Sequence, residues 1–215
     1  MKKINFNDRY GLTQAVIEGR NTMTRRLINP MPKDCAAVHK NCWGADWSDK
    51  PMSLVVDRDT GGIYCEYCGN GVRFYDGGYH YKAKYKVGEV VAVAQSYKTL
   101  LEQEGVPFEK LCVGIGANDI RWYNKMFVRA DLMPHQIRIT GIRIERLQDI
   151  SDEDCMKEGI MRTPLEMRCA FYFCNNECLY DSPLEAFAAL IDKVSGKGTW
   201  ARNPWVVAYE FELVK

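Results

Sequence analysis

A short polar stretch near the N-terminus carries the side chains of this sequence that are best suited to chemistry. Residues 19–30 read GRNTMTRRLINP and place three arginines and two threonines around Asn21. Guanidinium groups hold phosphates through charge-assisted, often bidentate hydrogen bonds. The amide of Asn21 is suited to pair with the polar edge of a base. The stretch therefore predicts a surface that recognises a nucleotide.

The same stretch alternates as a β-strand would, with a period of two residues. One face would carry Arg20, Thr22, Thr24 and Arg26, and the other Asn21, Met23, Arg25 and Leu27. On this pattern Arg25 points away from the ligand. The plain alternative is that the arginines pair with local carboxylates such as Glu18, and that the threonines reflect β propensity alone.

The near balance of acidic and basic residues excludes a strong overall electrostatic field. The 215 residues include 29 basic and 28 acidic side chains, so any contact with nucleic acid must come from a local patch. No apolar run approaches the roughly 20 residues that span a bilayer. The N-terminus MKKINFNDRYG lacks the apolar region of a secretory signal, and we expect a cytoplasmic location.

The elements that position the polar stretch can be predicted from local patterns. Residues 11–18 have helical apolar spacing and stop at Gly19, and the strand follows. Residues 33–80 form an irregular insertion with one hairpin around 53–64. The run VVAVAQSY at 90–97 predicts a buried strand, and residues 98–124 a further loop excursion.

The second half of the chain is more regular. The sequence QIRITGIRIERL at 136–147 predicts a strand with a bulge at Gly141, where the apolar phase changes. Ser151 caps a short helix, and the capping box SPLE starts a helix that runs to about Val194. A second insertion at 161–181 separates these helices, and WVVAYEFELV forms the last strand. Several β-rich runs with few long helices indicate a small mixed barrel.

Four blocks now stand in a recognisable order: GRNTMTRR, YKVGEVVAVAQSY, RITGIRIERLQDISDEDCMKEGI and AFAALIDKVSGKGTWARNPWVVAYEF. In this order they resemble the ASCH family of the PUA-like superfold, especially its larger bacteriophage and prophage members. The resemblance covers about half of the chain, roughly 10–30, 85–97, 125–160 and 183–214. It implies one α+β domain over 1–215, a PUA-like pseudo-barrel with a few short helices and insertions at about 33–80 and 161–181. It also implies a cleft beside the GRNTMTRR strand that holds RNA or a modified nucleotide.

At least one bacterial branch of that family hydrolyses N4-acetylcytidine with a lysine, a threonine and a glutamate. By motif the threonine corresponds to Thr24, the glutamate to Glu158 and the lysine to Asn21. A lysine with a lowered pKa can accept a proton, whereas an amide cannot. Because loss of a general base costs on the order of 10²- to 10⁴-fold in rate, we expect ligand binding without assured catalysis. The alternative is an amidohydrolase with Thr24 and Glu158 as catalytic groups and Asn21 as a hydrogen-bond donor. The plain alternative for Glu158 is a solvated carboxylate at a helix end.

Two further pairs extend the predicted ligand-binding set. Gln95 and Tyr97 follow a buried run and would reach the cleft mouth, where Tyr97 stacks on a base or serves as an ordinary rim aromatic. Lys125 and Arg129 flank the apolar residues MFV and would form a basic lip. The full set is Arg20, Asn21, Thr22, Thr24, Arg26, Gln95, Tyr97, Lys125, Arg129 and Glu158.

The nine cysteines indicate thiols or metal ligands in a reducing compartment rather than a disulfide framework. Cys65 and Cys68 lie in CEYCG, a zinc half-site. Cys35 and Cys42 would form the second half, with His39 as a substitute ligand, although their spacing is wider than usual. A structural Zn²⁺ would stabilise an insertion that has little apolar material.

A third candidate function involves the insertions. In a protein-interaction module of phage–host conflict, the insertions would carry the contacts. An exposed aromatic patch of Trp43, Trp47 and Tyr67 would support that function.

Overall fold

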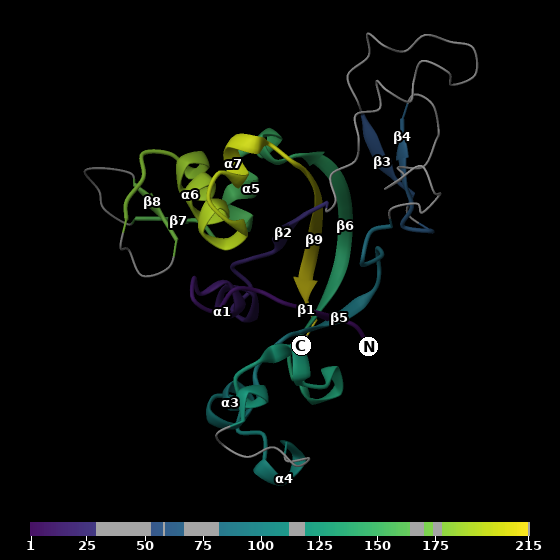
Figure 1. Ribbon diagram of the computed structural model, residues 1–215, viewed down its shortest axis with the longest axis vertical. Coiled ribbons are helices and arrows are strands. Elements are labelled where there is room, and N and C mark those ends of the chain that lie inside the picture. Colours follow the sequence, from purple (N-terminus) through teal and green to yellow (C-terminus); the bar gives the residue numbers. More distant parts are fainter. Residues whose placement is uncertain are drawn as a thin grey trace.

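The fold is mixed α+β and is built on one five-stranded sheet. The computed structural model describes residues 1–28, 53–57, 59–66, 82–111, 119–163, 170–173 and 178–214. The strand order is β1-β5-β6-β9-β2, and only the β1–β5 pair is parallel. The strands are β1 (Lys3–Ile4), β5 (Val90–Val93), β6 (Gln136–Arg146), β9 (Trp205–Leu213) and β2 (Met23–Leu27). Figure 1 shows β6 and β9 as long curved ribbons at the centre of the molecule.

The bulge predicted in β6 is confirmed. The register between β6 and β9 shifts between Ile139 and Gly141. A Cβ at Gly141 would lie 2.8 Å from a carboxylate oxygen of Glu210, so a larger residue here would have to displace the Glu210 side chain. The shift lets Ile137 and Ile139, and then Ile142, remain packed on the same core.

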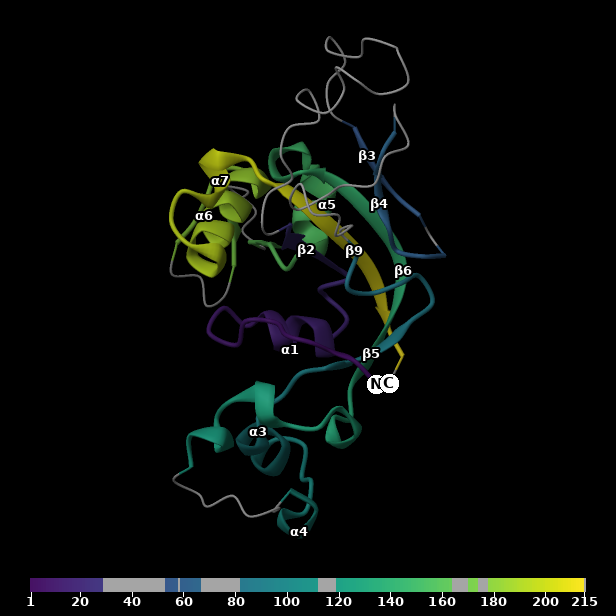
Figure 2. The same cartoon turned by 45° about the vertical axis from the view of Figure 1, so that its right-hand side comes forward.

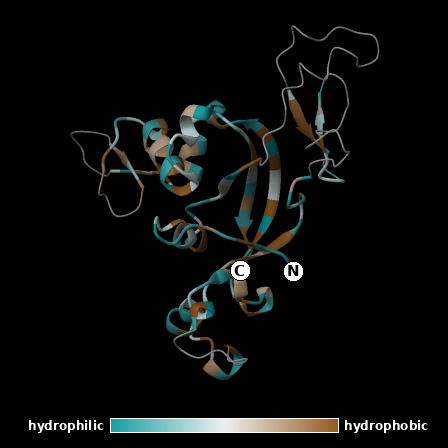
Figure 3. Ribbon diagram, in the orientation of Figure 1, coloured by the Kyte–Doolittle hydropathy of each residue, from teal (hydrophilic) through white to brown (hydrophobic). Residues whose placement is uncertain are grey.

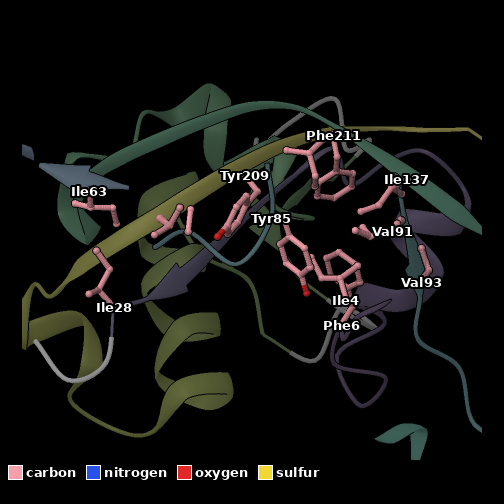
Figure 4. Packing of buried hydrophobic residues seen from close by; sticks show 14 of the residues in the cluster. Ile4, Phe6, Ile28, Ile63, Tyr85, Val91, Val93, Ile137, Tyr209 and Phe211 are labelled. Carbon is pink, nitrogen blue, oxygen red and sulfur yellow. The ribbon is translucent and has the colours of Figure 1, made fainter. Parts of the chain in front are cut away.

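The core on the inner face of the sheet is largely aromatic and β-branched. Tyr209 and Phe211 project from β9 towards Tyr85 and Phe6 (Figure 4). The Tyr85 and Tyr209 ring centroids lie 5.3 Å apart in an edge-to-face arrangement. The apolar sequence of β5, continuous in Figure 3, is explained by burial of Val91, Ala92 and Val93.

Helices cover the opposite, outer face of the sheet. They are α5 (Asp152–Lys157), α6 (Pro183–Ser195) and α7 (Thr199–Arg202), which Figure 2 shows together on one side of β9. The predicted caps are confirmed, because Ser151 accepts from the Asp154 N–H and Ser182 from the Glu185 N–H. The helix predicted over 11–18 is α1 (Leu12–Ile17).

The chain between β5 and β6 differs from the prediction. The strand expected to continue to Tyr97 ends at Val93, because Ser96 caps a helix by accepting from the Thr99 N–H. The helical segment that follows has its own core around Leu100 and Trp122. It comprises α3 (Tyr97–Glu102), α4 (Phe108–Leu111), η1 (Ile120–Trp122), η2 (Lys125–Phe127) and η3 (Ala130–Leu132).

The two predicted insertions contain small sheets. The hairpin expected around 53–64 is confirmed as β3 (Leu54–Val56) paired with β4 (Ile63–Cys65). The 161–181 region holds β7 (Met161–Arg162) and β8 (Phe171–Tyr172), and η4 (Leu147–Asp149) follows β6. Across the described ranges no helix combines the length and apolarity that crossing a membrane would require.

Candidate functional site

Strand β2 divides its side chains between the two faces of the sheet. Thr24 and Arg26 stand opposite Tyr209 and Val207 of β9, which belong to the inner core. Arg25 stands opposite Ala208 and contacts groups from α5 and β6 instead. We call Thr24 and Arg26 the β2 inner face. Because β2 is an edge strand, the backbone of Arg25 is free of strand pairing on the side away from β9, and it donates a hydrogen bond to the Glu158 carboxylate.

Arg25 is the centre of a buried ionic cluster. Its side chain is 1% exposed and contacts three carboxylates, with Nε 2.7 Å from Glu145, NH1 2.9 Å from Glu158 and NH2 3.0 Å from Asp154. Desolvation lowers the pKa of Arg25, but the charges of Glu158 and Glu145 outweigh it and raise the pKa. Arg25 is therefore fully neutralised by the protein itself. The strand alternation predicts that Arg25 points away from the ligand, but it does not predict which carboxylates Arg25 contacts.

Arg143 extends the cluster towards the solvent. Its NH2 lies 2.6 Å from Asp154 and its NH1 2.7 Å from Glu210. Desolvation raises the pKa of Asp154, but Arg25 and Arg143 lower it below its usual value. The two arginines thus fix α5 against β6 and β9.

Glu158 ends α5 and is buried rather than solvated. Only 6% of the residue is exposed. Burial raises the pKa of Glu158 to about 7, although the charges of Arg25 and Arg26 oppose the rise. The plain alternative of a solvated helix-end carboxylate is wrong. A carboxyl group with a pKa near neutrality can donate or accept a proton at physiological pH.

Asn21 joins the start of β2 to the end of α5. Its Nδ2 donates to the Glu158 carbonyl at 3.2 Å, and its Oδ1 accepts from the Met23 N–H at 3.3 Å. Gly159, which follows Glu158 in the sequence, has φ of 98°, and a Cβ there would lie 3.5 Å from Asn21 Nδ2. The structure thus brings Asn21 and Glu158 together. That Asn21 reads a base stays a prediction, and it would require the amide to release these bonds.

Arg26 differs from Arg25 in making no ion pair with any carboxylate among the described residues. Its guanidinium lies 5.3 Å from the Phe6 ring centroid and donates from NH2 to the Asn5 carbonyl. Its Nε is buried and has no hydrogen-bond partner within the described part of the chain, where no ion pair to Arg26 occurs either. Burial lowers the pKa of Arg26, and the nearby Tyr85 and Glu158 offset this only in part.

The position of Arg26 also matters for the sheet. Asn5 directly follows β1, which is the other edge strand. The Arg26 side chain therefore connects the two edges of the curved sheet through one hydrogen bond.

The remaining residues of the polar stretch have different surroundings. Thr24 is buried, and its hydroxyl makes no hydrogen bond to any described residue. The Thr22 N–H donates to the Lys157 carbonyl. Arg20 is exposed and pairs with Glu18 through Nε at 2.7 Å, as the plain alternative predicts.

Gln95 and Tyr97 lie apart from the β2 inner face, because the chain leaves the sheet after Val93. Gln95 is buried and donates to Glu104 at 2.6 Å. It lines a separate pocket of about 210 Å³ together with Asp8, Gly11, Thr13, Gln14, Ile17, Thr99 and Gln103. The Tyr97 ring stacks on Trp122 with centroids 6.0 Å apart, and only 5% of Tyr97 is exposed. That ring supports the helical segment.

Lys125 and Arg129 also differ from a simple basic lip. Lys125 Nζ donates to the Phe6 carbonyl and to the side chains of Asp8 and Thr13. Arg129 is exposed and pairs with Asp131. The exposure of the apolar residues next to Lys125 was not predicted from the sequence, although MFV is an apolar run between polar neighbours.

The predicted zinc ligands lie almost wholly beyond what the structure describes. Cys35, His39, Cys42 and Cys68 are outside the described residues, as are Trp43, Trp47 and Tyr67. The backbone of Cys65 ends β4. Among the residues that are described, no group of three or more His, Cys, Asp or Glu side chains has the arrangement of a metal site.

Comparison with known proteins adds no relative: no family model, curated protein or solved structure matches this chain. The resemblance to the ASCH family therefore rests on the four sequence blocks alone.

Proposed function

We propose that this protein binds RNA or a modified nucleotide at the β2 inner face. We also infer that the curved sheet is the pseudo-barrel of the PUA-like superfold. The Arg26 hydrogen bond to Asn5, which links the two edge strands, supports this fold. The proposal places the ligand beside Thr24, Arg26 and Glu158.

The proposal rests on the Arg26 guanidinium, which is buried and makes no ion pair with a described residue. A buried cation is costly unless it is paired and hydrogen-bonded. Arg25, one residue away, meets three carboxylates, whereas Arg26 retains an unpartnered Nε among the described residues. A ligand with a phosphate or carbonyl oxygen would supply the missing acceptor, and guanidinium groups are well suited to bidentate pairing with such oxygens.

Neighbouring groups fit the rest of a nucleotide. The Thr24 hydroxyl can donate or accept a hydrogen bond. The Glu158 carboxyl can do either at neutral pH, because burial raises its pKa to about 7. Tyr85 and Tyr209 lie close to Arg26, but both rings are buried against each other and form the floor of the site rather than a free stacking surface.

The test is a calorimetric titration of the protein with cytidine 5′-monophosphate and with its N4-acetyl derivative. Arg26→Gln should weaken binding at least about tenfold, since a charged hydrogen bond contributes roughly 1.5–3 kcal/mol. Arg26→Lys should restore only part of the affinity, because it keeps the charge without the planar donor geometry. Arg20→Gln is the matched control and should bind as the wild type does. Equal affinity of Arg26→Gln and the control would contradict the proposal.

The second candidate is hydrolysis of an acylated nucleoside, which the raised pKa of Glu158 favours. Glu158 would take a proton from the attacking hydroxyl or water, and the acyl C–N bond would break as the amine leaves protonated. If wild-type protein hydrolyses N4-acetylcytidine, Glu158→Gln should reduce the rate about 10²- to 10⁴-fold. Thr24→Val would then show whether the hydroxyl takes part. Nucleotide binding without turnover would rule out the hydrolase and leave the binding function.

A further inference from the structure

Exposed apolar side chains concentrate in the helical segment between β5 and β6. Five of the twelve exposed large hydrophobic residues that the structure describes lie there. They are Phe108, Ile120, Tyr123, Met126 and Phe127. Three of these five lie within five consecutive positions, with Tyr123 60%, Met126 62% and Phe127 52% exposed. We call Tyr123, Met126 and Phe127 the η2 lip.

The η2 lip adjoins the proposed ligand site through a single residue. Asn5 accepts a hydrogen bond from Arg26 through its carbonyl and donates from Nδ2 to Met126 Sδ at 3.2 Å. Arg26 and Met126 therefore flank the same residue. A strand of nucleic acid whose phosphate or base meets Arg26 would pass next to the lip.

The backbone of the lip is held firmly. Lys3 Nζ donates to the carbonyls of Lys125, Met126 and Val128 at 2.7–2.9 Å. The Tyr97 hydroxyl donates to the Phe127 carbonyl at 3.2 Å. Side chains that are exposed on a fixed backbone lose little conformational freedom when a ligand binds, which favours affinity.

Cations border the lip, although one of them, Lys98, also lies 4.0 Å from Glu102. Lys98 Nζ lies 5.7 Å from the Tyr123 ring centroid, so a cation borders the exposed ring. Lys3 and Arg26 add positive charge on the side of Asn5. Aromatic side chains next to cations are the usual combination in single-strand binding, where bases stack on rings and the backbone follows the charge.

We propose that the η2 lip stacks a nucleotide adjacent to the one held at Arg26, so that the ligand is a single-stranded RNA rather than a free nucleoside. This inference rests on the proposed function, because it requires an occupied β2 inner face. It assigns Tyr123 and Phe127 as stacking residues and Met126 as the junction between the two subsites.

The experiment compares a fluorescein-labelled RNA pentamer with cytidine 5′-monophosphate. Wild-type protein should bind the pentamer more tightly than the mononucleotide. Tyr123→Ala and Phe127→Ala should each weaken pentamer binding roughly 5- to 100-fold, the range for loss of one base–aromatic stack. Binding of the mononucleotide should stay unchanged. Leu179→Ala is the matched control, since Leu179 is 56% exposed and lies outside the lip.

The outcomes separate the two proposals. If the wild type binds the mononucleotide but the lip variants bind the pentamer as well as the wild type does, the lip is not a subsite and the nucleotide-binding function stands. If the wild type binds neither probe, both proposals are overturned. If sedimentation shows a wild-type dimer that Phe127→Ala dissociates, the lip serves a second copy of the chain and the RNA inference is overturned.

Discussion

Arg25 and Arg26 are neighbours in β2, yet Arg25 is surrounded by three carboxylates and Arg26 contacts none in the described structure. The alternation of a strand sends the two guanidinium groups to opposite faces of the sheet. On the outer face Arg25 holds α5 against β6. On the inner face Arg26 Nε has no hydrogen-bond acceptor among the described residues. One arginine is therefore structural, and the other is suited to a ligand.

Removing the Arg25 charge should destabilise the fold strongly. Arg25→Met leaves Glu145, Asp154 and Glu158 partly buried without their common partner, and such losses cost about 3–5 kcal/mol. The free energy of unfolding can be measured by urea denaturation. The control Arg20→Met removes an exposed pair and should cost at most about 1 kcal/mol. If the two substitutions cost the same, the cluster does not have the stabilising role described here.

Asn21 should contribute to stability through its two buried hydrogen bonds. In Asn21→Ala the Glu158 carbonyl and the Met23 N–H lose their partner, and we expect a loss of roughly 1–3 kcal/mol. Thermal unfolding monitored by circular dichroism would measure it. Gln14→Ala is a suitable control, because Gln14 is exposed and its side-chain amide donates to Glu18, which follows α1, and its effect should stay within about 0.5 kcal/mol. An Asn21→Ala melting curve that matches the control would show that these bonds are dispensable.

The stability of the protein should fall as the pH rises from about 5 to 7. Burial raises the pKa of Glu158 from 4.5 in the unfolded chain to about 7 in the folded state. Between these values the folded state binds more protons than the unfolded state, so raising the pH favours unfolding. The effect is at most on the order of 3 kcal/mol, given about 1.4 kcal/mol per pKa unit.

Urea denaturation at several pH values would reveal this dependence. Glu158→Gln keeps an acceptor for Arg25 and removes the titrating group, so the decline should largely disappear. The paired carboxyl of Asp154 does not interfere, because its pKa is lowered and it titrates below this window. A wild-type profile that is flat or rises between pH 5 and 7 would contradict a raised pKa.

Two cysteines should differ sharply in reactivity. Cys155 is fully buried in α5, and burial raises the pKa of its thiol to about 12, so almost no thiolate forms. Cys178 is exposed. Treatment with iodoacetamide at pH 8, followed by peptide mass spectrometry, should label Cys178 at once and Cys155 only in urea. Rapid labelling of native Cys155 would show that α5 opens far more readily than its packing indicates.

Local sequence patterns determined most of the elements around the site. The β2 alternation, the Gly141 bulge and the serine caps of α5 and α6 follow from interactions within a few residues. The same patterns correctly separated Arg25 from Arg26. The prediction that the strand continues beyond Val93 was wrong, because Ser96 caps a helix there. Gln95 and Tyr97 therefore lie away from β2.

The electrostatic character of the site was decided only by the tertiary structure. Whether an arginine is neutralised depends on carboxylates far along the chain, such as Glu145, Asp154 and Glu158 for Arg25. The pKa of Glu158 likewise depends on burial beneath elements that its neighbours in sequence do not specify. Side-chain types and spacing thus identified which groups could meet a ligand. Long-range packing, which sets desolvation and charge pairing, left the Arg26 Nε without a partner among the described residues.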